Sequence, residues 1–286
     1  MFGLNLKKKE KKNKTADSAV KVKNATAEEK AKEKNETESE SSVKFDLPRA
    51  VGKSKEKMEK DFYIFQIKEF MAKVGLLILP PVESVSDVEK ELYSAKKHCV
   101  NEILVTPILS ERFSTAPSVA GSSVSVLLDF PFGHGCLKGR ICSVKHIKNI
   151  VNGNIILTVP ISIDGAFLKQ RNVYHTEKAL KKTENGGVLV DAGIGLESMK
   201  KTFRAYADLK FKSFTLCALN LSGEELTSAV KCAMENKGCK DLYVLSDVDT
   251  SESLSEITAL GVCTVFTPNA VKIAEELEEK FSVTLS

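Results

Sequence analysis

The chain has 286 residues, of which 42% are apolar and 28% are charged, and its formal net charge is +4. Residues 1–60 hold 17 Lys and Arg against 11 Asp and Glu, whereas the rest of the chain holds 25 against 27. The composition is typical of a soluble protein of one large or two smaller domains, and the body lacks the basic surplus of a nucleic-acid-binding fold. We therefore expect no specific nucleic acid as a partner.

Apolar runs and cysteines narrow the class of protein further. The longest apolar run, Val74–Val82, is too short to span a bilayer, and no apolar segment follows the N-terminus, so neither a membrane nor secretion is expected. Seven cysteines without a CxxC pair indicate reduced thiols in a cytoplasmic protein. The four histidines are scattered, so we expect no metal and no other cofactor.

The chain begins with a low-complexity arm over residues 1–57, which includes the lysine-rich run Lys7–Lys14. So little apolar surface does not offset the entropy of ordering the chain, and we expect this arm to be disordered. Its first arginine is Arg49 and its acidic residues begin at Glu10, which argues against a mitochondrial presequence. Lys7–Lys14 is interpreted either as a nuclear-localisation or acid-binding patch, or as a solvated tail without a specific partner.

The body, residues 58–286, shows regular apolar patterns. A helix is predicted over Lys55–Lys73, and eight short, nearly continuous apolar runs follow, as in strands covered on both faces. These runs are Leu76–Leu79, Glu102–Thr106, Val124–Phe130, Ile155–Ile161, Val188–Asp191, Ser213–Ala218, Leu242–Ser246 and Val262–Thr267. Amphipathic helices are predicted between and after them, over Asp87–His98, Leu137–Ile150, Ala166–Thr183, Leu196–Lys210, Glu224–Asn236, Ser251–Leu260 and Asn269–Phe281. One short connection, Pro107–Ser123, carries no predicted helix.

Eight strands that alternate with helices every 20–32 residues predict a (β/α)8 barrel over 58–286, preceded by the disordered arm. The alternative is a doubly wound open sheet, which usually has a glycine-rich turn after its first strand. The corresponding segment, LPPVESVSD, has no glycine. Gly193–Ser198 imitates a dinucleotide-binding turn, but it follows the wrong strand. The barrel is therefore the favoured fold.

In a barrel of this kind the functional residues lie where the strands end. Acidic and hydroxyl side chains are predicted at this mouth, with one histidine: Asp129, His134, Asp164, Asp191, Asp247 and Thr267. The four aspartates are interpreted as helix caps rather than Mg²⁺ ligands, and His134 either as an acid or base or as an exposed loop residue. No predicted strand holds a lysine, and Asp247 and Asp249 would repel an anion.

The segment VSVLLDFPFGHG, which ends at Gly135, resembles the third strand of deoxyribose-phosphate aldolases and its closing Gly-Phe-Pro-x-Gly-Ala motif. Phe130, Pro131 and Gly133 match that motif, whereas aspartate and histidine replace its first glycine and its alanine. Similar matches lie at Leu76–Pro81, Ile103–Pro107 and Ile161–Leu168, so the resemblance extends over roughly residues 75–280. It implies an aldolase-type barrel.

The resemblance does not carry over the catalytic groups of that family. In this sequence, the position of the family's catalytic aspartate falls near Thr158. The positions of its three lysines fall at Gly187 or Val188, near Thr215 or Leu216, and near Val244 or Leu245. The position of its phosphate turn falls at Phe266–Pro268. Lys212 is the only lysine close to the sixth strand. It would be the Schiff-base residue if that strand began earlier, but it precedes the apolar run, which predicts a place at the bottom of the barrel.

Two functions follow from this resemblance. The first is a degenerate barrel that acts as a non-catalytic binding or scaffold protein. Its protein partners would bind the barrel surface or the basic arm, and the chain could also form a homo-oligomer. The second is a divergent class I aldolase, a carbon–carbon lyase that acts on a small sugar phosphate through Lys212. A cytoplasmic location is expected for either, or a nuclear one if Lys7–Lys14 is a localisation signal.

Overall fold

The computed structural model describes residues 53–81, 84–133, 135–159 and 170–285. Residues 1–52 of the predicted arm, together with His134 and Asp164, lie outside this part of the chain. The first helix, α1 (Lys53–Met71), begins inside the expected arm, so residues 53–57 are helical. Among the described residues, no helix is both long enough and apolar enough to cross a membrane.

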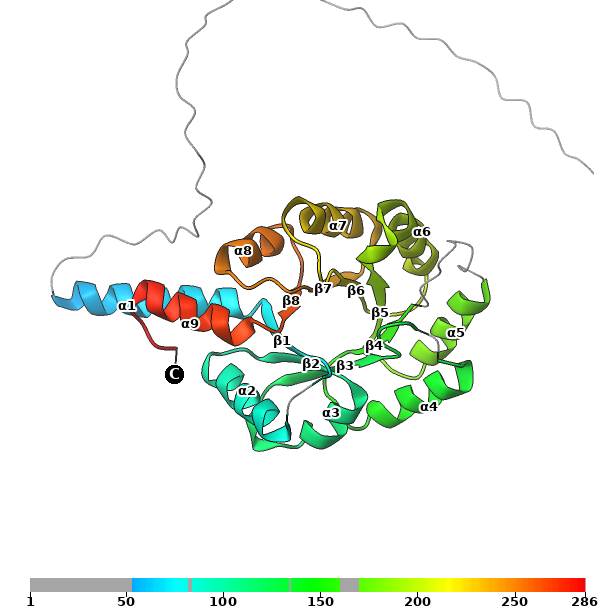
Figure 1. Ribbon diagram of the computed structural model, residues 1–286, viewed down its shortest axis with the longest axis horizontal. Helices are drawn as coiled ribbons and strands as arrows, with labels where there is room; N and C mark the ends of the chain where they lie inside the picture. Colours follow the sequence, from blue (N-terminus) through cyan, green and yellow to red (C-terminus); the bar gives the residue numbers. More distant parts are fainter. Residues whose placement is uncertain (1–52, 82–83, 134, 160–169, 286) are drawn as a thin grey trace, which may run out of the picture. The chain divides into compact units, whose positions relative to one another are not determined.

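Eight parallel strands close into a barrel, in the order of the sequence (Figure 1). They are β1 (Val74–Ile78), β2 (Glu102–Val105), β3 (Ser123–Leu128), β4 (Ile155–Thr158), β5 (Gly186–Asp191), β6 (Ser213–Cys217), β7 (Asp241–Leu245) and β8 (Thr264–Thr267). The barrel closes between β1 and β8, where Leu76 pairs with Thr267. The prediction of a (β/α)8 barrel is therefore confirmed.

Helices surround the strands and cover their outer faces (Figure 1). They are α2 (Val85–Lys97), α3 (Pro107–Phe113), α4 (Leu137–Ile147), α5 (Gln170–Leu180), α6 (Leu196–Ala207), α7 (Gly223–Asn236), α8 (Ser251–Ala259) and α9 (Ala270–Phe281). Helix α1 lies beside α9, where the rings of Tyr63 and Phe281 stack at 4.8 Å. The extra helix that precedes β1 thus packs on the last helix of the barrel.

The prediction that Pro107–Ser123 carries no helix is wrong. This connection holds α3 and a short 3₁₀ helix, Pro117–Val119. Pro107 occupies the first turn of α3, where a missing N–H costs nothing, and Leu109 and Phe113 are buried one turn apart. The seven-residue helix is too short to show a clear apolar period in the sequence.

Strand β3 ends earlier than predicted, at Leu128. Asp129 follows it with φ +61°, a left-handed conformation that stops an extended strand. This conformation is favourable for glycine, the residue that the aldolase motif has at the same point. The altered direction of the chain starts the loop that leads from β3 to α4.

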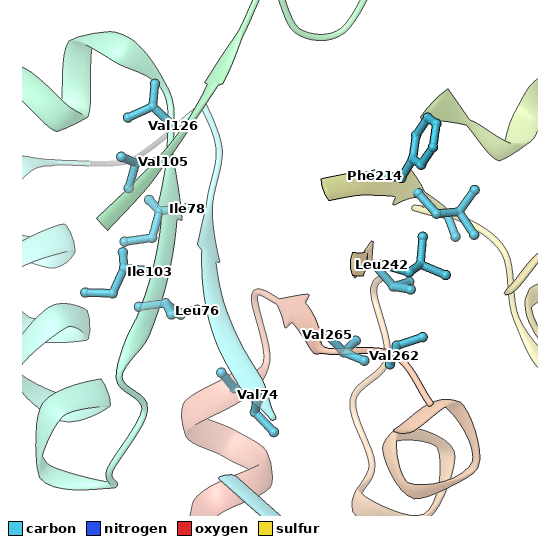
Figure 2. Close-up of a cluster of buried hydrophobic side chains, with 14 of the residues drawn as sticks. Val74, Leu76, Ile78, Ile103, Val105, Val126, Phe214, Leu242, Val262 and Val265 are labelled. Carbon is cyan, nitrogen blue, oxygen red and sulfur yellow. The ribbon is translucent and has the colours of Figure 1, made fainter. Parts of the chain in front are cut away.

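Alternate residues of each strand face two separate apolar layers. Between the strands and the helices lie the side chains labelled in Figure 2, among them Leu76 and Ile78 of β1 and Ile103 and Val105 of β2. The barrel interior is filled by a second cluster made of Leu77, Leu104, Leu127, Ile156, Leu189, Cys217, Leu245 and Phe266. Gly75 leaves the room for the Phe266 ring, because a Cβ at this glycine would collide with it. The interior is a packed core, so a ligand can bind only beyond it, at the C-terminal ends of the strands.

Candidate ligand site at the barrel mouth

The C-terminal ends of the strands bring polar residues from β5, β6 and β7 to one end of the barrel. Asp191 and Cys217 are the last residues of β5 and β6, and Asp247 lies two residues beyond the end of β7. Residues 191 and 217 are paired in the sheet register. These three side chains therefore lie near one another at the mouth.

Cys217 is buried at this mouth, with only 9% of its surface exposed. The pKa of its thiol is raised to about 12, chiefly by burial; a hydrogen bond from the Leu219 backbone opposes this rise, and the nearby carboxylates of Asp191 and Asp247 add to it. The sulfur therefore stays a neutral thiol near pH 7. An activated thiolate nucleophile would need a cation beside it and a lowered pKa instead.

Asp191, Asp247 and Thr267 also hold the loops of the mouth in place. Asp191 accepts a hydrogen bond from the Gly193 N–H at 2.9 Å, and Asp247 accepts one from the Asn220 N–H at 3.0 Å. Thr267, the last residue of β8, donates to the Val248 carbonyl at 2.7 Å. Within the described ranges, no group of three or more His, Cys, Asp and Glu side chains is arranged to hold a metal ion.

Asp129 is turned into the wall of the barrel by Arg140 of α4. The Nε atom of Arg140 lies 2.6 Å from Oδ2 of Asp129, a charge contact that lacks the angle of a hydrogen bond. The guanidinium also donates to the carbonyls of Gly133 and, at 3.1 Å, Thr158, and to the Thr176 hydroxyl at 3.4 Å. Arg140 is only 2% exposed. One buried cation thus connects the β3–α4 loop, the end of β4 and α5.

Arg140 was not among the residues predicted for the site, although the sequence carries a signal for it. It lies in the buried stripe of α4 with Val144 and Ile147, four and seven residues later. An arginine at a core position of a helix needs an acceptor of opposite charge, because a lone buried charge is costly. The nearest strand end holds Asp129, which supplies that charge.

Lys212 lies at the opposite end of the barrel from the mouth. It precedes β6, and its N–H donates to the carbonyl of Gly186, the first residue of β5, at 2.9 Å. Burial raises the pKa of the Glu102 carboxyl at the start of β2, and a hydrogen bond with Ser123 and the charge of Lys212 oppose this rise in part. Five residue steps along a strand place Lys212 about 16 Å from Cys217. The inward-facing position in mid-strand is Thr215, and none of the eight strands, as the structure describes them, holds a lysine.

Two pockets open beside the mouth, and Asp247 lines both. The larger, of about 360 Å³, lies between the end of β1, α2 and the loops after β6, β7 and β8, and is lined by Leu77, Ile78, Leu79, Pro81, Ser84, Asp87, Val88, Glu91, Leu219, Asp247 and Pro268. The smaller, of about 260 Å³, lies between the loops after β6 and β7 and is also lined by Asp249 and Glu256. Both pockets are acidic, and neither was predicted, because their walls come from segments far apart in the sequence.

No protein-family model and no curated protein sequence matches the chain. Solved structures do. The aldolase QR15 superposes with a TM-score of 0.66 at 13% identity, over 74% of this chain and 97% of that one. A tetrameric deoxyribose phosphate aldolase from Aeropyrum pernix gives 0.63 at 11% identity, over 76% and 96%. This chain has the fold of an aldolase-type barrel. The fold implied by the FPxG segment is thereby confirmed. At such low identity the likeness establishes the aldolase-type fold and leaves the activity to be argued from the residues.

Proposed function

We propose that this aldolase-type barrel is a binding protein that recognises a ligand or partner without catalysing aldol cleavage. The observation that carries the proposal is the place of Lys212, which lies at the start of β6, whereas the polar mouth lies at its end. A lysine side chain cannot span the intervening strand, whose five residues are buried. The position inside the barrel where an amine would be needed holds Thr215.

The chemistry of a class I aldolase sharpens the argument. Its lysine must be unprotonated to attack the substrate carbonyl, and the adduct then loses water to form an imine. Desolvation or a neighbouring cation is needed to keep the amine unprotonated. At this mouth, the charges around the end of β6 are the carboxylates of Asp191 and Asp247. Carboxylates would raise the pKa of a lysine and keep it protonated. They would also repel the phosphate of a sugar phosphate.

The competing proposal is a divergent class I aldolase that uses Lys212. It would require the substrate to reach the N-terminal end of the barrel, where Lys212 lies near the carboxyl of Glu102. The packed interior cluster around Leu104, Leu189 and Phe266 separates that end from the mouth. The placement of Lys212 therefore favours the binding role.

A trapping experiment separates the two proposals. The full-length protein and its Lys212→Met variant are incubated with 2-deoxyribose 5-phosphate and borohydride, and every lysine is examined by peptide mass spectrometry. We expect no adduct on any lysine, those in residues 1–52 and 160–169 included. A stoichiometric adduct that Lys212→Met removes, or one on any other lysine, would establish Schiff-base chemistry and overturn the proposal. A known aldolase of this fold, treated in parallel, verifies the trapping conditions.

Self-association belongs to the same proposal. One similar structure, that from Aeropyrum pernix, is tetrameric. Helix α1 of this chain exposes Met58 and Phe65 to 51% and 57%, apolar side chains of the kind that interfaces cover. Partners on the barrel surface or the basic arm, and a cytoplasmic or nuclear location through Lys7–Lys14, remain predictions from the sequence.

A further inference from the structure

The larger pocket has the walls of a small-molecule site. Its volume of about 360 Å³ lies in the range of ligand pockets, and the side chains of Leu77, Leu79, Val88 and Leu219 supply apolar surface. Pro81 and Pro268 stand on the exposed rim of the same pocket. An aliphatic chain of a few carbons would bury its surface here.

The charged side chains that line this pocket are all acidic. Its charged residues are Asp87, Glu91 and Asp247, and no described Lys, Arg or His lines it. Asp87 is already held by the Ser84 hydroxyl at 2.6 Å and by Lys90 at 3.1 Å, and Asp247 accepts the Asn220 N–H. These two carboxylates have partners within the chain.

Glu91 differs from them. Among the described residues it makes no hydrogen bond and no ion pair, although it is half-buried on the side of α2 that lines the pocket. Burial raises the pKa of its carboxyl. A desolvated carboxylate without a partner costs free energy, and a ligand cation would remove that cost.

The cation that fits is organic rather than metallic. No set of three carboxylate, thiol or imidazole side chains in the described ranges is arranged to hold a metal ion, whereas Ca²⁺ takes six to eight oxygen ligands. A primary ammonium donates three hydrogen bonds and needs only one carboxylate for its charge. An aliphatic stem attached to it would contact the leucines of the wall.

We propose that this pocket binds a small aliphatic amine, with one ammonium group on Glu91 and, in a diamine, a second directed to Asp247. The proposal rests on the binding role proposed above and assigns it a ligand class. The proposed site attracts a cation, whereas a sugar-phosphate site attracts an anion. The carboxylates at the mouth that would repel a phosphate would attract the ammonium groups of the amine.

Calorimetric titration of the full-length protein at pH 7.5 and low salt tests this proposal. The probes are 1,5-diaminopentane, 1-aminopentane, 1-pentanol and pentanoate, which share a chain length and differ in charge, together with inorganic phosphate. We expect the diamine to bind more tightly than the monoamine, and pentanol, pentanoate and phosphate not to bind measurably. Equal binding of pentanol and the amines, or binding of phosphate without the amines, would overturn the proposal.

Two single substitutions test whether Glu91 is the carboxylate that binds the ammonium group. Glu91→Gln removes the unpartnered carboxylate and should weaken binding of both amines by about tenfold to a hundredfold, the worth of a hydrogen bond to a charged group. Glu89→Gln makes the same change in net charge at an exposed position of α2 that does not line the pocket, and should leave both affinities unchanged. An equal loss in Glu91→Gln and Glu89→Gln would mean nonspecific attraction to an acidic surface and would refute the site.

Asp247→Asn provides a second, independent measurement. It should weaken the diamine by several-fold and leave 1-aminopentane unchanged, because only the diamine has a second ammonium group. Loss of both probes alike would overturn the two-point binding. The outcomes remain distinct from those of the trapping experiment: absent amine binding rejects the ligand class, whereas a lysine adduct rejects the non-catalytic role.

Discussion

Arg140 Nε lies 2.6 Å from Asp129 Oδ2, and this buried contact fixes the wall of the mouth between β3 and β4. The arginine comes from the first turn of α4, and the aspartate is the first residue after β3. Gly135 approaches the same carboxylate so closely that a Cβ at this glycine would collide with it. Asp129 is therefore a structural partner of Arg140 and contributes to the wall, whereas Asp191 and Asp247 remain at the mouth.

Replacing Arg140 should destabilise the protein strongly. Arg140→Ala leaves the Asp129 carboxylate without its countercharge and two carbonyls without their donor, and removal of one member of a buried pair costs about 3–5 kcal/mol. Denaturant unfolding measures the loss. Arg112→Ala, at an exposed position of α3, should change the free energy of unfolding by less than about 0.5 kcal/mol. Similar losses in the two variants would show that the Arg140 contacts do not stabilise the fold.

The half-buried carboxyl of Glu91 should make stability depend on pH. Its pKa is raised by burial, so the folded state binds this proton more tightly than the unfolded chain does. The stability that protonation contributes is present below the unfolded pKa of about 4.3 and is lost as the pH rises through the folded pKa.

Glu91→Gln removes this dependence. The variant should therefore be more stable than the wild type at pH 7 and equal to it near pH 4, as measured by denaturant unfolding at both values. Glu89→Gln should show no such pH-dependent difference, because Glu89 is exposed. A Glu91→Gln variant that is less stable at pH 7 would mean that the carboxylate has a partner within the protein.

Cys217 should resist alkylation while exposed cysteines react. With a pKa of about 12, only about one Cys217 side chain in ten thousand is a thiolate at pH 8. Iodoacetamide at that pH should modify the exposed Cys136, Cys142 and Cys239 and leave Cys217 unmodified, as quantified by peptide mass spectrometry. Labelling of Cys217 as fast as that of Cys142 would contradict the carboxylate-lined, buried environment described for it.

Much of the barrel could be predicted from the sequence because parallel strands are buried on both faces. Each strand then appears as a short apolar run, and the runs Ser213–Ala218 and Leu242–Ser246 predicted β6 and β7 in this way. The same apolar runs separated Lys212 from the strand that follows it. Helix α3 was missed because its seven residues make fewer than two full turns, too few to establish a period.

The site could be predicted only in part, because its contacts join distant segments. The ends of β5 and β7 were identified from strand order, which placed Asp191 and Asp247 at one end of the barrel. The pairing of Arg140 with Asp129 depends on the left-handed turn after Leu128, which no local pattern specifies. Glu91 belongs to the solvent-facing pattern of α2, and only the fold brings it to the pocket beside the mouth.

Aldol cleavage by the full-length protein is the most direct test of the central claim that the mouth binds without catalysing. Acetaldehyde release from 2-deoxyribose 5-phosphate is followed for the wild type and the Lys212→Met variant, with a known aldolase of this fold as the positive control. We predict no release above the buffer rate for either protein. Release by the wild type that Lys212→Met abolishes would contradict the claim and establish the barrel as an aldolase.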